Sequence, residues 1–385
     1  MTTTPVPHAE VRVDLAAIRD NVAELRSRAV AAEVLAVVKA DAYGHGLVPS
    51  ARAALAGGAT WLGTAVLAEA LQLRAAGVPG RLLAWLSAPG EAWGDAIAAD
   101  VDVSASASWA VDEIADAARA AGKTARVHLK VDTGLGRSGS TIDDWPALVD
   151  AALKAEAEGV IGVVGLWSHF AIADAPGHPT VVRQIEVFRD AVSYAESRGA
   201  APEVRHLANS AATLTRPDAH FDLVRPGLAV YGLSPIPDQA APAEVGLRQA
   251  MSVRSRLALV KRVRAGQGVS YGHFYVTDRE TTLGLVPLGY GDGVPRHGSS
   301  GDGGPGAPVL VGGVVRPVAG RVCMDQFVLD LRDTPAESGD EVVLFGDGAA
   351  GEPTAQDWAQ ACRTISYEIV TRFGPRLPRT YVGGS

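Results

Sequence analysis

The chain has 385 residues, 47% of them hydrophobic and 20% charged, so it is long enough for two domains that each bury a core. A formal net charge of −8, with no basic run, argues against a nucleic-acid-binding protein. No stretch reaches the roughly 20 apolar residues of a membrane span, and residues 1–13 lack the features of a secretory signal. The two cysteines are too few for a disulfide framework. We therefore expect a cytoplasmic protein with no membrane or nucleic-acid partner.

The first half of the chain alternates β-rich and Ala-rich segments. Asp14 is the expected N-cap of a first helix, which carries apolar residues at helical spacing. Strands are predicted at 34–39, 61–65, 81–86, 101–105, 126–131, 160–169, 204–208 and 222–225. Helices are predicted between them at 69–76, 109–121, 145–156 and 181–198. Eight strands in such an alternation predict an α/β fold, a (β/α)₈ TIM-like barrel, with a doubly wound open sheet as the alternative.

The pattern changes near residue 245. Long runs rich in β-branched residues follow at 251–263, 281–290, 309–331 and 341–345, which predicts a mostly antiparallel β domain. Helices are expected at 355–363 and 366–373, and residues 298–308 are expected to form an exposed loop. The predicted domains are a barrel over 14–245 and a β-rich domain formed by 1–13 and 246–385.

A lysine stands where the first barrel strand ends. Lys39 follows an apolar run and precedes a polar, glycine-containing segment, so we expect it to be partly desolvated and its pKa to be lowered. Such an amine can act as a Schiff-base nucleophile or as a base. The alternative is a solvated lysine at the end of a strand.

Other polar residues fall at the ends of later strands, where barrels carry their chemistry. His169 ends the sixth strand, and Ser210 follows the seventh. After the eighth come Arg225 and then Gly227 and Leu228, whose backbone N–H groups are candidates for binding phosphate. A lysine and a phosphate-binding site at the same end of a barrel fit pyridoxal phosphate.

Two motifs point elsewhere. Residues 134–139 match the dinucleotide pattern G-x-G-x-x-G, but they follow the fifth predicted strand, and no acidic residue ends the next strand about 20 positions on. Residues 268–272 match the hydrolase pattern G-x-S-x-G, but a β-rich segment follows where that motif needs a helix. The histidines show no zinc spacing, so no metal is expected. Lys130 faces the barrel interior beside Asp132, either as an ion pair or as a modified lysine.

Six motifs are spread along the whole chain: AVVKADAYG (36–44), KVDTGLGR (130–137), WSHF (167–170), VRPG (224–227), VSYG (269–272) and GRVCMDQ (320–326). Together they resemble the motifs of alanine racemases. The resemblance implies pyridoxal 5'-phosphate bound to Lys39. The residues it implies for binding the phosphate are Tyr43, Ser210, Gly227, Leu228 and Tyr367. Lys130 matches a lysine that is carbamylated in some members of that family, so the resemblance makes it a candidate for carbamylation.

The resemblance further implies a two-base reaction that interconverts L-alanine and D-alanine for peptidoglycan. Lys39 and Tyr271 would be the bases, and a network of His169, Arg225 and His206 would support them. Arg137 and the Met324 backbone N–H would hold the substrate carboxylate, and Arg225 would meet the cofactor's pyridine nitrogen. It implies a homodimer with shared active sites, in which Tyr271 and Met324 reach the partner's barrel.

Three other interpretations stay open on the sequence alone. A barrel-type pyridoxal-phosphate decarboxylase is disfavoured because such enzymes place a carboxylate where Arg225 stands. A non-catalytic pyridoxal-phosphate carrier would need no second base such as Tyr271. A dehydrogenase depends only on the match at 134–139.

Overall fold

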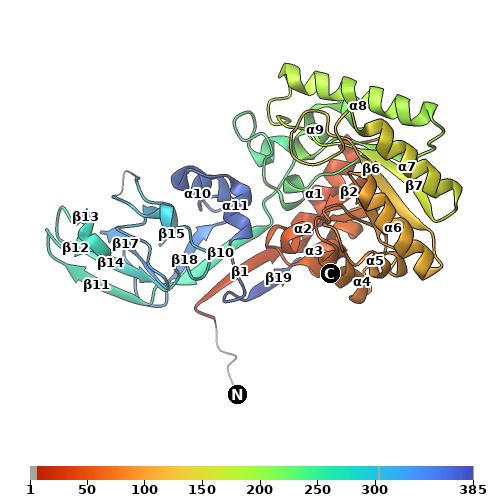
Figure 1. Ribbon diagram of the computed structural model, residues 1–385. Coiled ribbons are helices and arrows are strands. Elements are labelled where there is room, and N and C mark those ends of the chain that lie inside the picture. The colour runs from red at the N-terminus through yellow and green to blue at the C-terminus, as the bar shows by residue number, and fades with distance from the viewer. Residues whose placement is uncertain (1–6, 302–303, 385) are drawn as a thin grey trace. The chain divides into compact units, whose positions relative to one another are not determined.

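The computed structural model describes residues 7–301 and 304–384, which fall into two compact units (Figure 1). The barrel unit comprises Ile18–Ala42 and Leu47–Leu247. The sheet unit comprises the described residues of Met1–Ala17, Tyr43–Gly46 and Arg248–Ser385.

The barrel unit is built on an eight-stranded sheet with strand order β8-β7-β6-β5-β4-β3-β2-β9, and each strand pairs in parallel with its neighbour. The strands are β2 (Glu33–Val37), β3 (Trp61–Thr64), β4 (Arg81–Ala84), β5 (Asp102–Ala105), β6 (Ala125–Lys130), β7 (Ile161–Trp167), β8 (Val204–His206) and β9 (Leu223–Val224). Two backbone hydrogen bonds, Asp222 N to Arg205 O (3.0 Å) and Arg225 N to Ala208 O (2.9 Å), join the segments around β8 and β9. The sheet is thus a nearly closed TIM-like barrel, as predicted, and the open-sheet alternative is wrong.

Helices follow most of these strands and cover the outside of the sheet (Figure 1). They are α1 (Leu15–Arg28), α2 (Lys39–Tyr43), α3 (Leu47–Ala56), α4 (Leu67–Ala75), α5 (Trp93–Ala98), α6 (Ser108–Ala121), α7 (Trp145–Ala157), α8 (Pro179–Ser197) and α9 (Ser210–Thr215), with 3₁₀ turns η1 (Pro217–Ala219), η2 (Leu228–Tyr231) and η3 (Pro242–Val245). The predicted cap is confirmed, because the Asp14 carboxylate accepts a hydrogen bond from Ala17 N at 3.1 Å. The short helices α3 and α5 were not predicted.

The sheet unit contains a six-stranded sheet with order β16-β15-β18-β10-β1-β19, a three-stranded sheet β11-β14-β17 and the pair β12-β13. Its strands are β1 (Ala9–Asp14), β10 (Met251–Arg256), β11 (Leu259–Val263), β12 (Gly268–Val269), β13 (Tyr275–Val276), β14 (Thr281–Val286), β15 (Pro308–Val311), β16 (Val314–Pro317), β17 (Phe327–Arg332), β18 (Glu341–Phe345) and β19 (Arg379–Val382). Two helices, α10 (Ala355–Cys362) and α11 (Ser366–Thr371), and two 3₁₀ turns, η4 (Tyr271–His273) and η5 (Arg296–Gly298), complete it. All pairs are antiparallel except β1 with β19, as expected of a mostly antiparallel domain.

Two predicted runs are divided in the structure. The run 251–263 breaks at Leu257 and Ala258, whose amides bond to Asp340 O and Leu285 O, so the chain changes from one sheet to the other. The run 309–331 is broken by the pair Gly312 and Gly313, with φ of +56° and +75°. Two consecutive positive φ angles make the tight turn of a two-residue hairpin, here between β15 and β16.

The expectation of an exposed loop at 298–308 holds only in part, because Gly301 and Pro305 are exposed but most of the other described residues there are buried. Residues 302 and 303 lie outside the described residues, but Ser299 and Ser300 are buried. The Ser300 hydroxyl accepts a hydrogen bond from Gly320 N at 2.7 Å, so it packs against the segment that follows β16.

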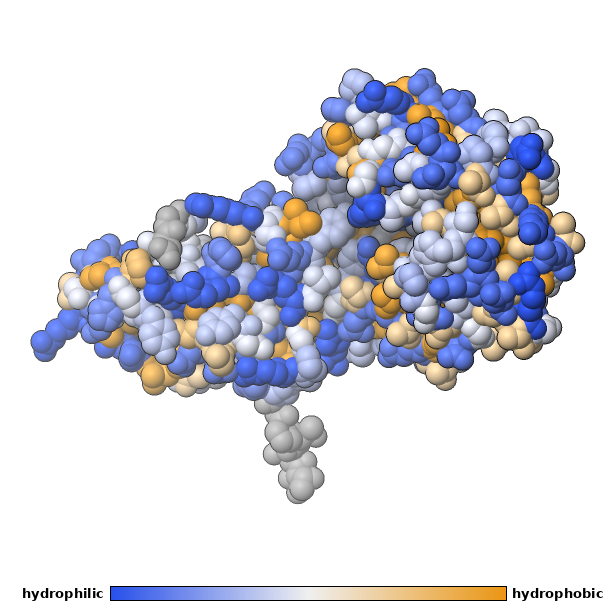
Figure 2. Space-filling view, viewed as in Figure 1, coloured by the Kyte–Doolittle hydropathy of each residue, from blue (hydrophilic) through white to orange (hydrophobic). Residues whose placement is uncertain are grey.

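The surface carries hydrophilic and hydrophobic residues side by side in the view of Figure 2. In the part of the chain that the structure describes, no helix combines the length and the apolar character needed to cross a membrane.

Candidate active site

Lys39 begins a left-handed helical turn, α2, two residues beyond the end of β2. The next three residues, 40–42, have φ of 54–55° and ψ of 44–53°. None of them is glycine, and each such residue costs about 1–2 kcal/mol. Contacts from elsewhere in the barrel stabilise the turn, because Asp41 N donates to Glu69 Oε1 and Asp41 Oδ1 accepts from Leu47 N, both at 2.8 Å. The strain is concentrated beside the predicted nucleophile, as is common at functional sites.

The pKa of the Lys39 amine is lower than that of an ordinary lysine. Burial lowers its pKa first, the guanidinium of Arg137 lowers it further, and the carboxylate of Glu69 opposes the shift. A half-buried amine with a lowered pKa is a stronger candidate nucleophile and base than a solvated lysine.

The glycine loop after β6 is folded around the chain's own carboxylate. Asp132 accepts hydrogen bonds from the backbone N–H groups of Gly134, Leu135 and Gly136 at 2.8–2.9 Å. These amides are the groups that a dinucleotide phosphate would need. The loop therefore serves to hold the segment that carries Arg137. The match to G-x-G-x-x-G reflects this loop conformation and does not indicate a dinucleotide site.

Lys130, at the end of β6, is buried in the barrel mouth. Its ammonium donates to Ser138 Oγ and lies 4.3 Å from the centre of the Trp167 ring. Burial, followed by the nearby charges of Arg225 and Arg137, lowers its pKa to about 7. Within the described residues no ion pair joins Lys130 to Asp132, so the ion-pair interpretation of these two residues is not supported.

Arg225 lies just after β9 and is buried. Its Nη1 donates to His206 Nδ1 (3.1 Å), and its Nη2 donates to Ser168 O (2.8 Å), to Leu207 O (3.3 Å) and to His169 Nδ1 (3.3 Å). Burial lowers the pKa of Arg225 to about 9, which still leaves it a cation at neutral pH. The predicted group of His169, Arg225 and His206 thus comes together as one hydrogen-bonded set.

Both histidines in this set are neutral. Burial lowers the pKa of His169 and of His206 well below its usual value, and the positive charge of Arg225 adds to the shift in each. Since Arg225 donates to both, each must accept through Nδ1.

The residues predicted to bind phosphate lie together at the start of α9 and η2. Ser210 is buried, and its Oγ accepts hydrogen bonds from Gly227 N at 2.8 Å and from Ala229 N at 3.2 Å. The two backbone amides therefore point at the Ser210 hydroxyl, which gathers three polar groups at the start of α9 and η2. Ala229 was not among the predicted residues, whereas the predicted Leu228 begins the same turn.

Two further predicted phosphate ligands belong to the sheet unit. The rings of Tyr43 and Tyr367 lie 6.0 Å apart between centroids, with the Tyr43 ring buried. Burial raises the pKa of Tyr43, so its hydroxyl stays protonated and can donate a hydrogen bond.

Tyr271 and Met324 lie on two loops of the sheet unit that are fastened to one another. Ser270 Oγ donates to Arg321 O (2.7 Å) and lies 3.3 Å from Cys323 Sγ. The turn is tight, with φ of +59° at Ser270, and it leaves the Tyr271 side chain 71% exposed. Met324 is 54% exposed. A short 3₁₀ turn, η4, follows Ser270 in place of the helix that a hydrolase nucleophile requires, as expected.

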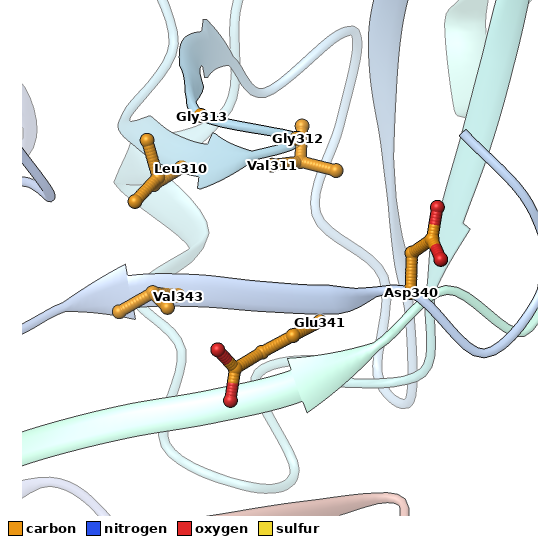
Figure 3. A pocket seen from close by; sticks show the side chains of 7 residues that line it. All are labelled: Leu310, Val311, Gly312, Gly313, Asp340, Glu341 and Val343. Carbon is orange, nitrogen blue, oxygen red and sulfur yellow. The ribbon is translucent and has the colours of Figure 1, made fainter. Parts of the chain in front are cut away.

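A separate pocket of about 360 Å³ lies in the sheet unit (Figure 3). Its lining comes from the β15–β16 turn and the start of β18, and consists of Leu310, Val311, Gly312, Gly313, Asp340, Glu341 and Val343. None of these is a predicted site residue.

Comparisons with known proteins agree with this geometry. Residues 13–235 match the family model "Alanine racemase, N-terminal domain" and residues 250–381 match "Alanine racemase, C-terminal domain". The chain belongs to the alanine racemase family. Its activity is that of an alanine racemase, an isomerase, and the decarboxylase alternative is not favoured.

The similarity to individual alanine racemases extends over nearly the whole chain. The alanine racemase of Frankia casuarinae is 63% identical over 370 residues, 96% of this chain and 95% of the relative. The crystal structure of alanine racemase from D-cycloserine-producing Streptomyces lavendulae is 59% identical with a TM-score of 0.96, covering 100% of this chain and 99% of the other. The Bacillus anthracis alanine racemase with bound L-Ala-P is 34% identical with a TM-score of 0.88, covering 100% and 97%.

Proposed function

We propose that the chain interconverts L-alanine and D-alanine with pyridoxal 5'-phosphate bound at the carboxyl ends of the barrel strands, with Lys39 as its covalent anchor. The observation that carries the proposal is the set of groups gathered there: a lysine of lowered pKa, a buried arginine, and two amides converging on the Ser210 hydroxyl. The donor set fits the cofactor, because it offers an amine for an aldehyde, N–H groups for a phosphate and a cation for a ring nitrogen.

Ser210, Gly227, Leu228, Tyr43 and Tyr367 would hold the phosphate, and Arg137 with the Met324 backbone N–H would hold the substrate carboxylate. When bound, pyridoxal phosphate draws electron density from the attached amino acid and so acidifies its α-hydrogen.

Racemisation requires a proton acceptor on each face of the α-carbon. The Lys39 amine would remove or return the proton on the D-alanine side, since its lowered pKa provides a neutral amine more readily. The Tyr271 hydroxyl would do the same on the L-alanine side. His169 is its proposed hydrogen-bond partner, and Arg225 and His206 hold His169 in place.

Arg225 would also limit the reaction to proton transfer. As a donor that stays charged at neutral pH, it would leave a ring nitrogen unprotonated and keep the ring a weak electron sink. Rapid return of the proton is then favoured over transamination.

We further propose a homodimer in which the sheet unit completes the partner's site. The exposure of Tyr271 and Met324 on fastened loops supports this assignment, because large side chains held out by a rigid turn are suited to a partner surface. The barrel over 14–245 would bind the cofactor, and residues 1–13 with 246–385 would contribute Tyr271 and Met324. The D-alanine produced would supply peptidoglycan synthesis.

The cofactor assignment is tested by absorbance. The purified protein is expected to show a yellow band that borohydride reduction removes, and Lys39→Ala is expected to lose the band. Lys123→Ala, at a lysine paired with Asp100 on the barrel unit, is the matched control and should keep it. A wild-type protein reconstituted with pyridoxal phosphate that never acquires the band would refute the assignment.

The two-base assignment is tested with deuterium. In deuterium oxide, Tyr271→Phe should still exchange the α-hydrogen of D-alanine through Lys39 but should lose racemisation, while Tyr194→Phe behaves as wild type. Equal loss of exchange from both enantiomers would contradict separate bases.

The shared site is tested by mixing a Lys39→Ala chain with a Tyr271→Ala chain. Each hybrid dimer would hold one intact site, so statistical exchange should restore about a quarter of wild-type activity. No recovery after proven subunit exchange would indicate sites built within one chain.

A further inference from the structure

A line of hydrogen bonds continues from Arg225 away from the barrel mouth. His206 Nε2 lies 2.9 Å from His128 Nδ1, and His128 Nε2 lies 3.2 Å from Asp102 Oδ2. Asp102 is the first residue of β5, so the line runs from the carboxyl ends of the strands to an amino end. All four side chains are at most 5% exposed.

The direction of every bond in this line is set by its two ends. A guanidinium can only donate, so His206 accepts at Nδ1 and carries its proton on Nε2. That N–H donates to His128 Nδ1, which puts the His128 proton on Nε2, facing the carboxylate of Asp102. A reversed His206 would set its Nδ1–H against an N–H of Arg225, and a reversed His128 would set its Nδ1–H against the Nε2–H of His206.

The pairing of β6 with β7 is irregular beside His128 and leaves space for its ring. The register between β6 and β7 shifts between Val127 and His128, which brings Gly165 opposite the histidine. A methyl group on Gly165 would lie 2.0 Å from His128 Nδ1, so only glycine leaves room for the ring. Two tryptophans confine the imidazoles. The Trp61 ring is perpendicular to that of His128, with 5.7 Å between centroids, and the Trp167 ring is stacked with that of His206, with 5.6 Å between centroids.

The far end of the line is anchored by surface charges. Asp102 Oδ1 accepts from Arg126 Nε at 2.9 Å, and its Oδ2 lies 3.4 Å from Arg81 Nη2. Both arginines also bind Glu203, at 2.8–3.0 Å. The carboxylate is therefore held in one orientation, with Oδ2 towards His128.

We propose that Asp102 and His128 are positioning residues for racemisation, which fix the tautomer of His206 and thereby the orientation of the Arg225 guanidinium. They touch neither substrate nor cofactor and act only through His206. This inference rests on the proposed role of Arg225 at the cofactor ring.

Asp102→Asn is the most selective perturbation, because it removes the charge and keeps the shape. The Asn amide can present N–H to His128 Nε2, which would reverse both tautomers and oppose Arg225. We expect kcat to fall about 10- to 100-fold, the usual loss when the partner that orients a histidine is removed, with the KM for L-alanine unchanged. His220→Asn, at another buried histidine, bound to Thr213 O, is the control and should keep its kcat.

A second readout does not depend on activity. Nitrogen-15 NMR of histidine side chains should show His128 and His206 of the wild-type protein as neutral Nε2–H tautomers, with and without pyridoxal phosphate. Asp102→Asn should change the tautomer of at least one of them. A wild-type Nδ1–H tautomer at His206, or an Asp102→Asn protein with unchanged tautomers and unchanged kcat, would overturn the proposal.

Double variants test whether the residues act as one unit. His128→Gln with Asp102→Asn should reduce kcat no more than the stronger single variant, since both interrupt the same line. Full additivity would show independent effects and contradict the proposal. If the tautomers are as stated but no yellow band forms, the proposed cofactor role fails while the hydrogen-bonded line stands.

Discussion

Because the turn after Lys39 is left-handed, we predict that a substitution to glycine there stabilises the protein, the opposite of its usual effect in a helix. Ala40 is exposed, with φ of 55° and ψ of 53°. An L-residue in this region costs about 1–2 kcal/mol, which glycine largely avoids. Glycine also makes the unfolded chain more flexible, which costs about 0.4–1 kcal/mol. Ala40→Gly should therefore stabilise the protein by about 0.5–1 kcal/mol, the difference between these two terms.

The matched control is Ala117→Gly in the right-handed helix α6, where no strain is relieved and the same substitution should destabilise by about 0.5–1 kcal/mol. Urea unfolding of both variants at one protein concentration measures the two values. Racemase activity of Ala40→Gly is expected to fall, because a freer turn holds Lys39 less firmly. If Ala40→Gly destabilised the protein as much as Ala117→Gly, the turn would not be strained and the reasoning would be refuted.

Three other substitutions test the barrel mouth. Arg225→Glu should slow racemisation and raise transamination, measured as pyruvate formed per racemisation event; an unchanged ratio counts against the proposed role. The pKa of Lys130 is about 7 in the folded chain against a usual 10.5, so the unfolded chain binds more protons between these values and Lys130 makes stability rise with pH there. In CO₂-free buffer Lys130→Met should remove that rise, and with ¹³CO₂ above pH 7 the wild type should give a carbamate signal that Lys130→Met lacks. Asp132→Ala leaves three amides without their acceptor, so it should lower the free energy of unfolding by about 1–3 kcal/mol and raise the KM for alanine, whereas Asp143→Ala, at an exposed site, should do neither.

The barrel was predictable because each of its strands can be recognised from the residues of the strand itself. Each predicted strand overlaps an observed one, since buried parallel strands are short apolar runs bounded by polar residues. The switch between sheets at Leu257 was not predictable, because it depends on Asp340 and Leu285, which are distant in the chain.

The left-handed turn was missed for a related reason. Residues 40–42 read Ala-Asp-Ala, which favours a right-handed helix, and only contacts with Glu69 and Leu47 hold the observed conformation. Likewise, the partners of His128 could not be predicted, because Asp102 and His206 lie 26 and 78 positions away. Lone histidines carry no signal of pairing over such separations.

The shifted pKa values of the residues in the barrel mouth have a common cause. The pKa values of Lys39, Lys130 and His169 are all lowered, first by burial and then by nearby guanidinium groups. Each cation in the cluster therefore raises the free energy of the others, and any anion that enters relieves several of them at once. A phosphate, a substrate carboxylate and a carbamate on Lys130 are three such anions. Because they share one field, binding of the phosphate should raise the pKa of Lys130 and so reduce carbamate formation, which couples the two events without direct contact.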